Sequence, residues 1–100
     1  MKIKSTQNYR EWFSSIKDEI TRARVNLRVK RLADGNPGQH RILTGGVIEL
    51  KLSFGPGYRV YYTIKGGEII LLLIGGDKST QQKDIVNALK LAEKIKEELP

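Results

Sequence analysis

Residues 47–78, VIELKLSFGPGYRVYYTIKGGEIILLLIGGDK, decide the fold because they contain three strand-like runs separated by two glycine turns. In the first two runs apolar side chains alternate with polar ones, which is the period of half-buried β-strands. We therefore predict three consecutive antiparallel strands, the first two with one apolar and one polar face. The alternating apolar positions are Ile48, Leu50, Leu52, Val60, Tyr62 and Ile64.

The glycine turns predict how these strands pair. The apolar faces coincide only if the first loop has an odd number of residues, and Gly55-Pro56-Gly57 gives such a loop. The second turn, Gly66-Gly67, is a two-residue hairpin signal. The expected pairs are Leu52 with Val60, Leu50 with Tyr62, Ile48 with Ile64, Lys51 with Tyr61, Ser53 with Arg59, Tyr62 with Leu71, and Arg59 with Ile74.

This register places polar side chains together on one face of the sheet. Glu49, Lys51, Arg59 and Tyr61 are expected to share that face, with Lys78 at its rim. Two cations and a carboxylate on neighbouring strands are groups that can bind a phosphate and move a proton. We predict the functional site here.

Two amphipathic helices are predicted before these strands, after a short strand at residues 1–5. The first begins near Tyr9, and the second covers residues 21–33 and ends at the Asp34–Gly38 segment, where glycine and proline stop a helix. The expected apolar stripe of the first helix is Trp12, Phe13, Ile16 and Ile20. That of the second is Ala23, Leu27 and either Arg31 or Leu32.

A weak strand at residues 41–43 and a final helix complete the predicted elements. Ser79 and Gln82 have the spacing of a capping box, so we expect the helix to begin at Ser79. Its expected apolar stripe is Ile85, Ala88 or Leu89, Ala92, Ile95 and Leu99.

These elements predict a single α+β domain over residues 1–100. In the third strand Ile69, Leu71 and Leu73 point one way, and Ile70, Leu72 and Ile74 the other. Helices are therefore expected to cover much of both faces of the sheet.

The charge of the chain favours a polyanionic partner. The net charge is +7, and residues 1–78 hold 14 Lys and Arg against 7 Asp and Glu, whereas residues 79–100 hold four of each. Nucleic acid is favoured over a membrane, because no surface helix with exposed aromatic residues is evident. The alternative is that the basic charge only aids solubility.

The composition also indicates the cellular compartment of the protein and whether it uses a metal or cofactor. The chain has no cysteine, and its longest apolar run, residues 69–74, is too short to span a bilayer. Neither a signal peptide nor a cluster of metal-ligating residues is evident, and His40 lacks a motif around it. We expect a cytoplasmic protein that uses no metal and no cofactor.

The second helix carries a run of cations without an intervening acid. Such a run is either a solvated face or a surface that contacts phosphates of RNA or of a ribosome, and the sequence leaves both interpretations open. The candidate RNA-binding residues are Arg22, Arg24, Arg28, Lys30 and Arg31, together with Tyr61 on the strand face.

A basic strand face can cleave RNA through attack by the neighbouring 2′-hydroxyl. Arg59 is the strongest candidate for phosphate stabilisation, because a planar guanidinium holds two oxygens at once. Lys51 is a candidate for phosphate binding or proton exchange, and Lys78 for charge stabilisation from the rim. Glu49 is an alternative general base.

Two segments, ELKLSFGPGYRVYYT and LLLIGGDKSTQQKDI, also resemble RelE/ParE-superfamily toxins, specifically HigB-like addiction-module killer proteins. The resemblance implies a RelE-like fold with two amino-terminal helices, a twisted antiparallel sheet and a carboxyl-terminal helix. It implies an mRNA endoribonuclease that acts on ribosome-bound messages. We expect a cognate antitoxin, a small helix-turn-helix protein, as its inhibitor.

The resemblance also implies residue roles. Arg59 in GPGYRVYY matches the phosphate-contacting catalytic arginine of the superfamily, Lys51 matches a functional basic position on the preceding strand, and Lys78 approximates a later basic residue. The tyrosine or histidine that several relatives carry toward the carboxyl terminus has no counterpart in residues 79–100. A ParE-like noncatalytic topoisomerase inhibitor and a noncatalytic RNA-binding module are the alternatives.

Overall fold

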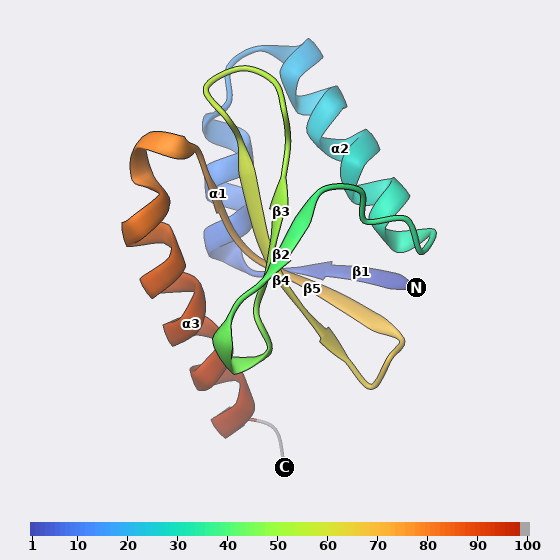
Figure 1. Cartoon of the computed structure of the whole chain (residues 1–100), viewed down its shortest axis with the longest axis vertical. Helices are drawn as coiled ribbons and strands as arrows, with labels where there is room; N and C mark the ends of the chain where they lie inside the picture. Colours follow the sequence, from blue (N-terminus) through green and yellow to red (C-terminus); the bar gives the residue numbers. More distant parts are fainter. Residues whose placement is uncertain (99–100) are drawn as a thin grey trace.

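The computed structural model describes residues 1–98 and shows an α+β fold, which confirms the predicted class (Figure 1). Within these residues five strands form one sheet with three α-helices. The elements are β1 (Lys2–Ser5), α1 (Gln7–Ser15), α2 (Glu19–Ala33), β2 (His40–Ile42), β3 (Ile48–Lys51), β4 (Arg59–Lys65), β5 (Ile69–Gly76) and α3 (Gln81–Glu98), with single 3₁₀ turns η1 (Thr44–Gly46) and η2 (Lys78–Thr80).

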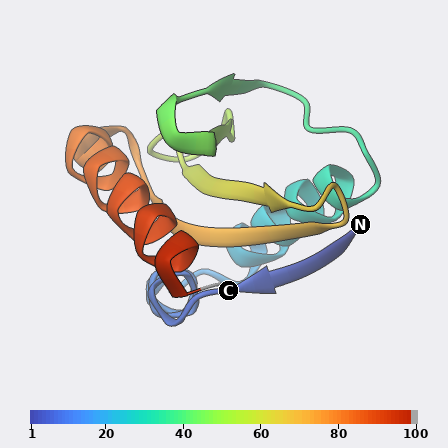
Figure 2. The ribbon, with the colours of Figure 1, turned by 90° about the horizontal axis from the view of Figure 1, so that it is seen from below.

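The sheet is mixed, with strand order β1-β5-β4-β3-β2. The predicted amino-terminal strand exists, but it pairs parallel to β5, so the expectation of a purely antiparallel sheet is wrong at this edge. Alternation along β1 indicates a strand but carries no information about its partner or direction. The weak strand near residue 41 is confirmed as β2, which forms the opposite edge (Figure 2).

The register between β3 and β4 differs from the prediction by two residues. Lys51 lies opposite Arg59 and Glu49 opposite Tyr61, because residues 52–58 form the loop. Leu52 is buried against the helices, and its N–H donates to the Tyr58 carbonyl oxygen inside this longer loop. A shift of two residues keeps each side chain on its expected face, so the predicted common face of these four residues is confirmed.

The β4–β5 hairpin also departs from the prediction. Lys65 pairs with Ile69, so the turn contains three residues, and Arg59 lies opposite Gly76 instead of Ile74. A β-bulge inserts Leu73 opposite the Tyr61–Tyr62 step. Because of this extra residue, Leu73 and Ile74 both pack toward α3, and the expected strict alternation fails at Ile74.

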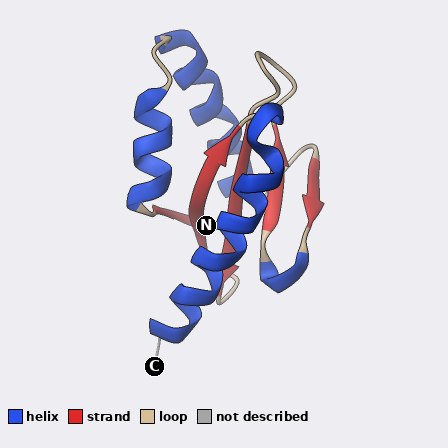
Figure 3. Ribbon diagram, turned by 90° about the vertical axis from the view of Figure 1, so that its left-hand side faces the viewer, coloured by secondary structure: helices blue, strands red, loops and turns tan. Residues whose placement is uncertain are grey.

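Helices cover both faces of the sheet, as predicted (Figure 3). α1 and α2 lie on one face, where Val25, Val29 and Leu32 of α2 are buried against the strands. α3 lies on the other face, where Ala88 and Ala92 are buried. None of the helices in residues 1–98 combines the length and apolarity that crossing a membrane requires.

The apolar stripe predicted for the first two helices is partly wrong. Ile20 is 71% exposed and Leu27 is 61% exposed, because the chain leaves the helical conformation at Ile16 and begins again after Asp18. The Asp18 carboxylate caps α2 by accepting from the Ile20 and Thr21 N–H groups. This break resets the helical phase, so that Val25 is buried and Ala23 is exposed.

The junction between β5 and α3 explains the glycine pair in IGGDK. Gly75 and Gly76 lie in β5, where a Cβ atom on Gly75 would overlap the Trp12 ring and one on Gly76 would overlap the Asp84 carboxylate. The capping box is formed by Asp77 and Thr80, so the expected Ser79–Gln82 box is wrong, and α3 begins at Gln81. Leu99 of the predicted stripe lies outside the described residues.

Replacing Gly76 by alanine should therefore destabilise the fold by about 3 kcal/mol or more, because the added methyl group has no space beside Asp84. Gly35→Ala is the control, since Gly35 has a φ of 90° and no neighbour near its missing Cβ, so that substitution costs roughly 1–2 kcal/mol. Urea unfolding measures both changes. Equal losses of unfolding free energy in the two variants would show that close packing is not the reason why position 76 requires glycine.

Candidate active site

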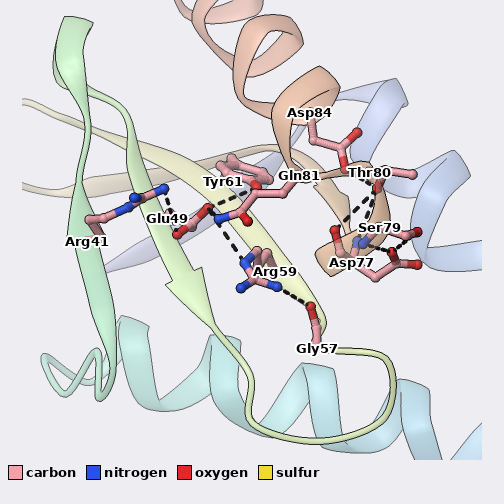
Figure 4. Close-up of polar contacts among 10 residues, drawn as sticks. All are labelled: Arg41, Glu49, Gly57, Arg59, Tyr61, Asp77, Ser79, Thr80, Gln81 and Asp84. Carbon is pink, nitrogen blue, oxygen red and sulfur yellow. Dashed lines mark hydrogen bonds and ion pairs between the residues drawn. The ribbon is translucent and has the colours of Figure 1, made fainter.

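The candidate site lies on the face of the sheet that α3 only partly covers, at the start of β4 (Figure 4). At its centre is the Glu49 carboxylate, which is fully buried. Its Oε2 accepts hydrogen bonds from the Tyr61 hydroxyl and from Gln81 Nε2, each at 3.0 Å. Arg41 Nη2 lies 3.3 Å from Oε1, and Arg59 Nε lies 3.8 Å from Oε2. One carboxylate thus joins β2, β3, β4 and α3.

Arg59 is held from both ends of its guanidinium group. Its Nη1 donates to the Gly57 carbonyl oxygen at 2.7 Å, and its Nε faces Glu49 at a distance that suits an ion pair but is too long for a hydrogen bond. The side chain remains 12% exposed. Among the side chains of residues 1–96, Nη2 of Arg59 has no hydrogen-bond partner, so this nitrogen is free to meet an anion.

Two lysines add positive charge beside Arg59. Lys51 lies directly opposite on β3 and is half-buried. Lys78 is exposed at the start of η2, and its N–H donates to the Pro56 carbonyl oxygen at 3.3 Å. A Cβ atom added at Gly57 would lie 3.3 Å from Lys78 Cβ and 3.2 Å from Arg59 Nη1. The structure therefore places Lys51 opposite Arg59 in the sheet, and Lys78 beside the turn whose Gly57 carbonyl oxygen accepts from Arg59.

The two remaining predicted residues of this face are enclosed. Tyr61 is fully buried, so its ring presents no surface to RNA, in contrast to the predicted RNA contact. Burial, followed by the negative charge of Glu49, raises the pKa of the Tyr61 hydroxyl, which therefore stays protonated and donates to Glu49. Glu49 is itself covered by its four partners, a geometry that suits an anchor for Arg59 better than a general base.

The basic run on α2 lies on the opposite face of the sheet, and its members have different environments. Arg22 Nη1 donates to the Ile16 carbonyl oxygen, and Arg28 donates to Pro37 O at 3.0 Å and to Lys51 O at 2.9 Å. These two arginines hold the fold together. The exposed members of the run are Arg24, Lys30 and Arg31.

His40, which has no motif around it in the sequence, lies away from this site. His40 pairs with Leu50, so its side chain lies on the face away from Glu49, and its Nδ1 lies 2.8 Å from the Gly38 carbonyl oxygen. Among the described side chains, those of residues 1–96, no three from His, Asp or Glu converge in a way that could hold a metal ion.

Comparison with known proteins assigns a family. The family described as "Phage derived protein Gp49-like (DUF891)" matches residues 11–97. The chain belongs to this family. An uncharacterized protein of Haemophilus influenzae is similar to the Gp49-like chain, with 42% identity over 95 residues, which are 95% of this chain and 96% of the relative.

The Gp49-like family belongs to the RelE/ParE-like toxin superfamily, and it is a family of toxin–antitoxin toxins. Membership implies an antitoxin as partner. The family is associated with ribonuclease toxins, for which a cluster of cations on a strand face is a suitable phosphate-binding surface.

Two residues of this Gp49-like site were missed by the sequence analysis. Arg41 lies opposite Glu49 on β2, and Gln81 is the first residue of α3. Arg41 could have been found only by pairing the weak strand with β3, which brings it beside a carboxylate on the polar face. Gln81 gave no usable signal, because a polar residue at a helix start is ordinary.

The contact between Tyr61 and Glu49 predicts a specific pH dependence. Tyr61→Phe removes one donor to the buried carboxylate and should cost about 1–2 kcal/mol at neutral pH. Above pH of about 10 the unfolded wild-type chain loses the tyrosine proton while the folded chain retains it, so wild-type stability falls as pH rises. The Tyr61→Phe variant lacks this contribution, so its free energy of unfolding should fall less steeply as pH rises.

Urea unfolding midpoints across the alkaline range test this prediction. The tyrosines other than Tyr61 remain in both proteins, so the difference between the two curves isolates this hydroxyl. Parallel curves above pH of about 10 would contradict the raised pKa of Tyr61.

Proposed function

We propose that this Gp49-like toxin is a HigB-like, ribosome-dependent mRNA endoribonuclease that cleaves by attack of the 2′-hydroxyl on the adjacent phosphate. The observation that carries the proposal is Arg59, which is held by Glu49 and Gly57 with its Nη2 free and has Lys51 directly opposite. A pre-positioned cation pair of this kind can stabilise the charge that develops on a phosphate during cleavage.

The proposed reaction has three requirements. A base removes the 2′-hydroxyl proton, the oxygen forms a bond to phosphorus, and the bond from phosphorus to the 5′-oxygen breaks as that oxygen gains a proton. The products are a 2′,3′-cyclic phosphate and a free 5′-hydroxyl. These steps require proton transfer and charge stabilisation, which side chains can supply without a metal or cofactor.

We assign roles from the positions of the side chains. Arg59 donates from its free Nη2 to a non-bridging phosphate oxygen, and Lys78 adds charge from the rim. Lys51 lies where it can bind the phosphate or exchange the proton, and the two roles are separable by substitution. Glu49 and Tyr61 position Arg59, because the carboxylate is enclosed and the phenol is buried.

Substitution of Arg59 tests the cleavage proposal. Arg59→Ala should abolish growth arrest and lower cleavage of translated mRNA by roughly a hundredfold or more, because it removes a preorganised stabiliser of the phosphate. Arg59→Lys should recover little, because an ammonium lacks the guanidinium fork. Lys90→Ala, an exposed charge removal on α3, should leave cleavage unchanged.

Mapping of transcript ends in expressing cells, together with circular dichroism of each variant, provides the measurement. Lys51→Arg separates the two roles of Lys51: retained cleavage indicates phosphate binding, and lost cleavage with retained RNA binding indicates proton exchange. Unchanged transcript ends during full growth arrest would reject the ribonuclease and favour a topoisomerase inhibitor. RNA binding without arrest or cleavage would indicate a noncatalytic RNA-binding module.

We also propose that the antitoxin is a small helix-turn-helix protein that covers the Arg59 face directly. The support is charge: Lys51, Arg59 and Lys78 form a basic surface that an acidic segment would complement. Charge reversal at Lys51 and Arg59 should weaken antitoxin binding by about tenfold or more, and antitoxin should slow hydrogen exchange over residues 49–61.

Calorimetry and hydrogen exchange on the purified complex measure these two effects. Reversal of Lys90 and Lys94 on α3 is the matched control for the change in net charge. The antitoxin binds elsewhere if two results are obtained. The variant with reversed charges at Lys51 and Arg59 would bind the antitoxin with full affinity, and the antitoxin would not slow hydrogen exchange near residues 49–61.

A further inference from the structure

A cavity of about 490 Å³ lies at the outer edge of β5, next to the start of β4. This volume is within the range of pockets that hold a small ligand. The cavity is distinct from the candidate active site, because its lining does not include Arg59, Lys51 or Glu49. The lining residues that bear on its chemistry are Trp12, Tyr58, Gly75, Gly76, Asp77 and Asp84.

Two features of β5 shape this cavity. Within the described chain β1 pairs only with residues 69–72 of β5, so no strand covers the outer edge of Gly75 and Gly76. The two glycines also lack side chains that would fill the space. A Cβ atom on Gly75 would lie 2.2 Å from the Trp12 ring, and one on Gly76 would lie 1.8 Å from Asp84 Oδ2. The glycine pair therefore lets an aromatic ring and a carboxylate approach the strand closely.

Trp12 and Tyr58 form an aromatic wall of the cavity. Their ring centroids lie 6.3 Å apart and their planes meet at 69°, so a flat ligand can stack on one ring and meet the edge of the other. Both side chains are partly buried, and Tyr58 also packs on Phe54 with ring centroids 5.7 Å apart. The wall is ordered before any ligand arrives, which lowers the entropy lost on binding.

The polar end of the cavity offers hydrogen-bond acceptors. Asp84 is only 7% exposed, and its Oδ2 accepts from the Thr80 hydroxyl (Figure 4). In the described part of the chain Asp84 Oδ1 has no hydrogen-bond partner. Asp77 adds a second carboxylate, whose pKa is held below its ordinary value first by hydrogen bonds from Ser79 and more weakly by the charge of Arg59.

We propose that this cavity binds a nucleobase that carries an exocyclic amino group, which is guanine, adenine or cytosine rather than uracil. An amino group donates to the free carboxylate oxygen of Asp84, whereas a carbonyl oxygen of uracil in the same place would be repelled. The face of the base stacks on the aromatic wall, which every base can do. The wall thus gives affinity and the carboxylate gives the choice of base.

The base belongs to a nucleotide beside the phosphate held at Arg59, an identification that rests on the proposed ribonuclease function. Tyr58 directly precedes Arg59, and Gly76 pairs with Arg59 across the sheet, where paired residues lie about 5 Å apart. Lys17 at the rim of the cavity and Lys78 at the start of η2 are exposed cations that can hold the phosphates outside it. The cavity would therefore give the cleavage reaction a preference among bases.

Two pyrimidine nucleotides test the cavity on the wild-type protein. Cytidine 3′-monophosphate has an amino group where uridine 3′-monophosphate has a carbonyl oxygen, so the pair is matched. NMR titration of the purified protein follows the indole N–H signal of Trp12, since the chain has one tryptophan. The cytidine nucleotide should bind roughly tenfold more tightly. Equal affinities, or an indole signal that neither nucleotide shifts, would overturn the proposal.

The variant Asp84→Asn tests which group chooses the base. The asparagine oxygen can still accept from Thr80, while its NH₂ group replaces the free carboxylate oxygen with a donor. The preference should therefore reverse toward the uridine nucleotide, a change that loss of stability alone would not produce. Glu93→Gln, which removes the same charge from an exposed position on α3, should keep the wild-type preference.

Circular dichroism shows whether the Asp84→Asn variant folds. A folded variant that still prefers the cytidine nucleotide would overturn the proposal. If the variant does not fold, the comparison of the two nucleotides on the wild-type protein decides alone. Binding of agmatine, a guanidinium compound, without binding of either nucleotide would assign the cavity to a cationic side chain of a partner protein and overturn the proposal.

Mapping of transcript ends separates failure of this inference from failure of the proposed function. Wild-type cleavage should be depleted of uridine on one side of the cut, and Asp84→Asn should remove that depletion. An absence of cleavage by the wild-type protein would reject the ribonuclease, while the nucleotide titration would still report on the cavity. Cleavage without a base preference, together with equal affinities for the two nucleotides, would reject only the base site.

Discussion

The buried carboxylate of Glu49 is the constraint on which the candidate site around Arg59 depends. Removing a charged carboxylate from water costs several kcal/mol unless hydrogen bonds and opposite charges compensate. Here Tyr61, Gln81, Arg41 and Arg59 provide that compensation from three other elements. A shift in the register of β3 or a displacement of α3 would leave the charge unpaired. The carboxylate therefore links the position of Arg59 to correct assembly of the sheet.

The same contacts explain how a toxin with so small a domain can present an ordered cation. An arginine on an exposed strand would lose considerable side-chain entropy when it binds a phosphate. Arg59 has already lost much of that freedom, because Glu49 and the Gly57 carbonyl oxygen limit its conformations. The stability of the fold thus contributes to the proposed phosphate binding. Tyr61, which is fully buried, and Gln81, which is half-buried, both act on Arg59 through their hydrogen bonds to Glu49.

The sequence was sufficient to predict which residues share the face of the sheet around Arg59, but not the loops and contacts that connect them. Glu49, Lys51 and Arg59 were placed together because alternation defines a face, and an error of two residues in register does not change it. The loop length was wrong because Leu52 looks like a strand residue, whereas it packs in the core beyond the strand. Arg41 and Gln81 were missed because their contacts with Glu49 join elements far apart in the sequence, which no local pattern encodes.

The basic side chains of α2 support the backbone around Arg59 as well as contributing charge to the surface. Arg28 reaches across from α2 to bind the Lys51 carbonyl oxygen, at the residue whose side chain lies opposite Arg59 on the other face. Arg24 packs on Phe54, and Phe54 in turn packs on Tyr58, immediately before Arg59. Contacts from the α2 side thus fix part of the seven-residue loop at residues 52–58. The run of cations is therefore neither wholly a solvated surface nor wholly an RNA contact, because part of it fixes the backbone that carries the proposed catalytic cations.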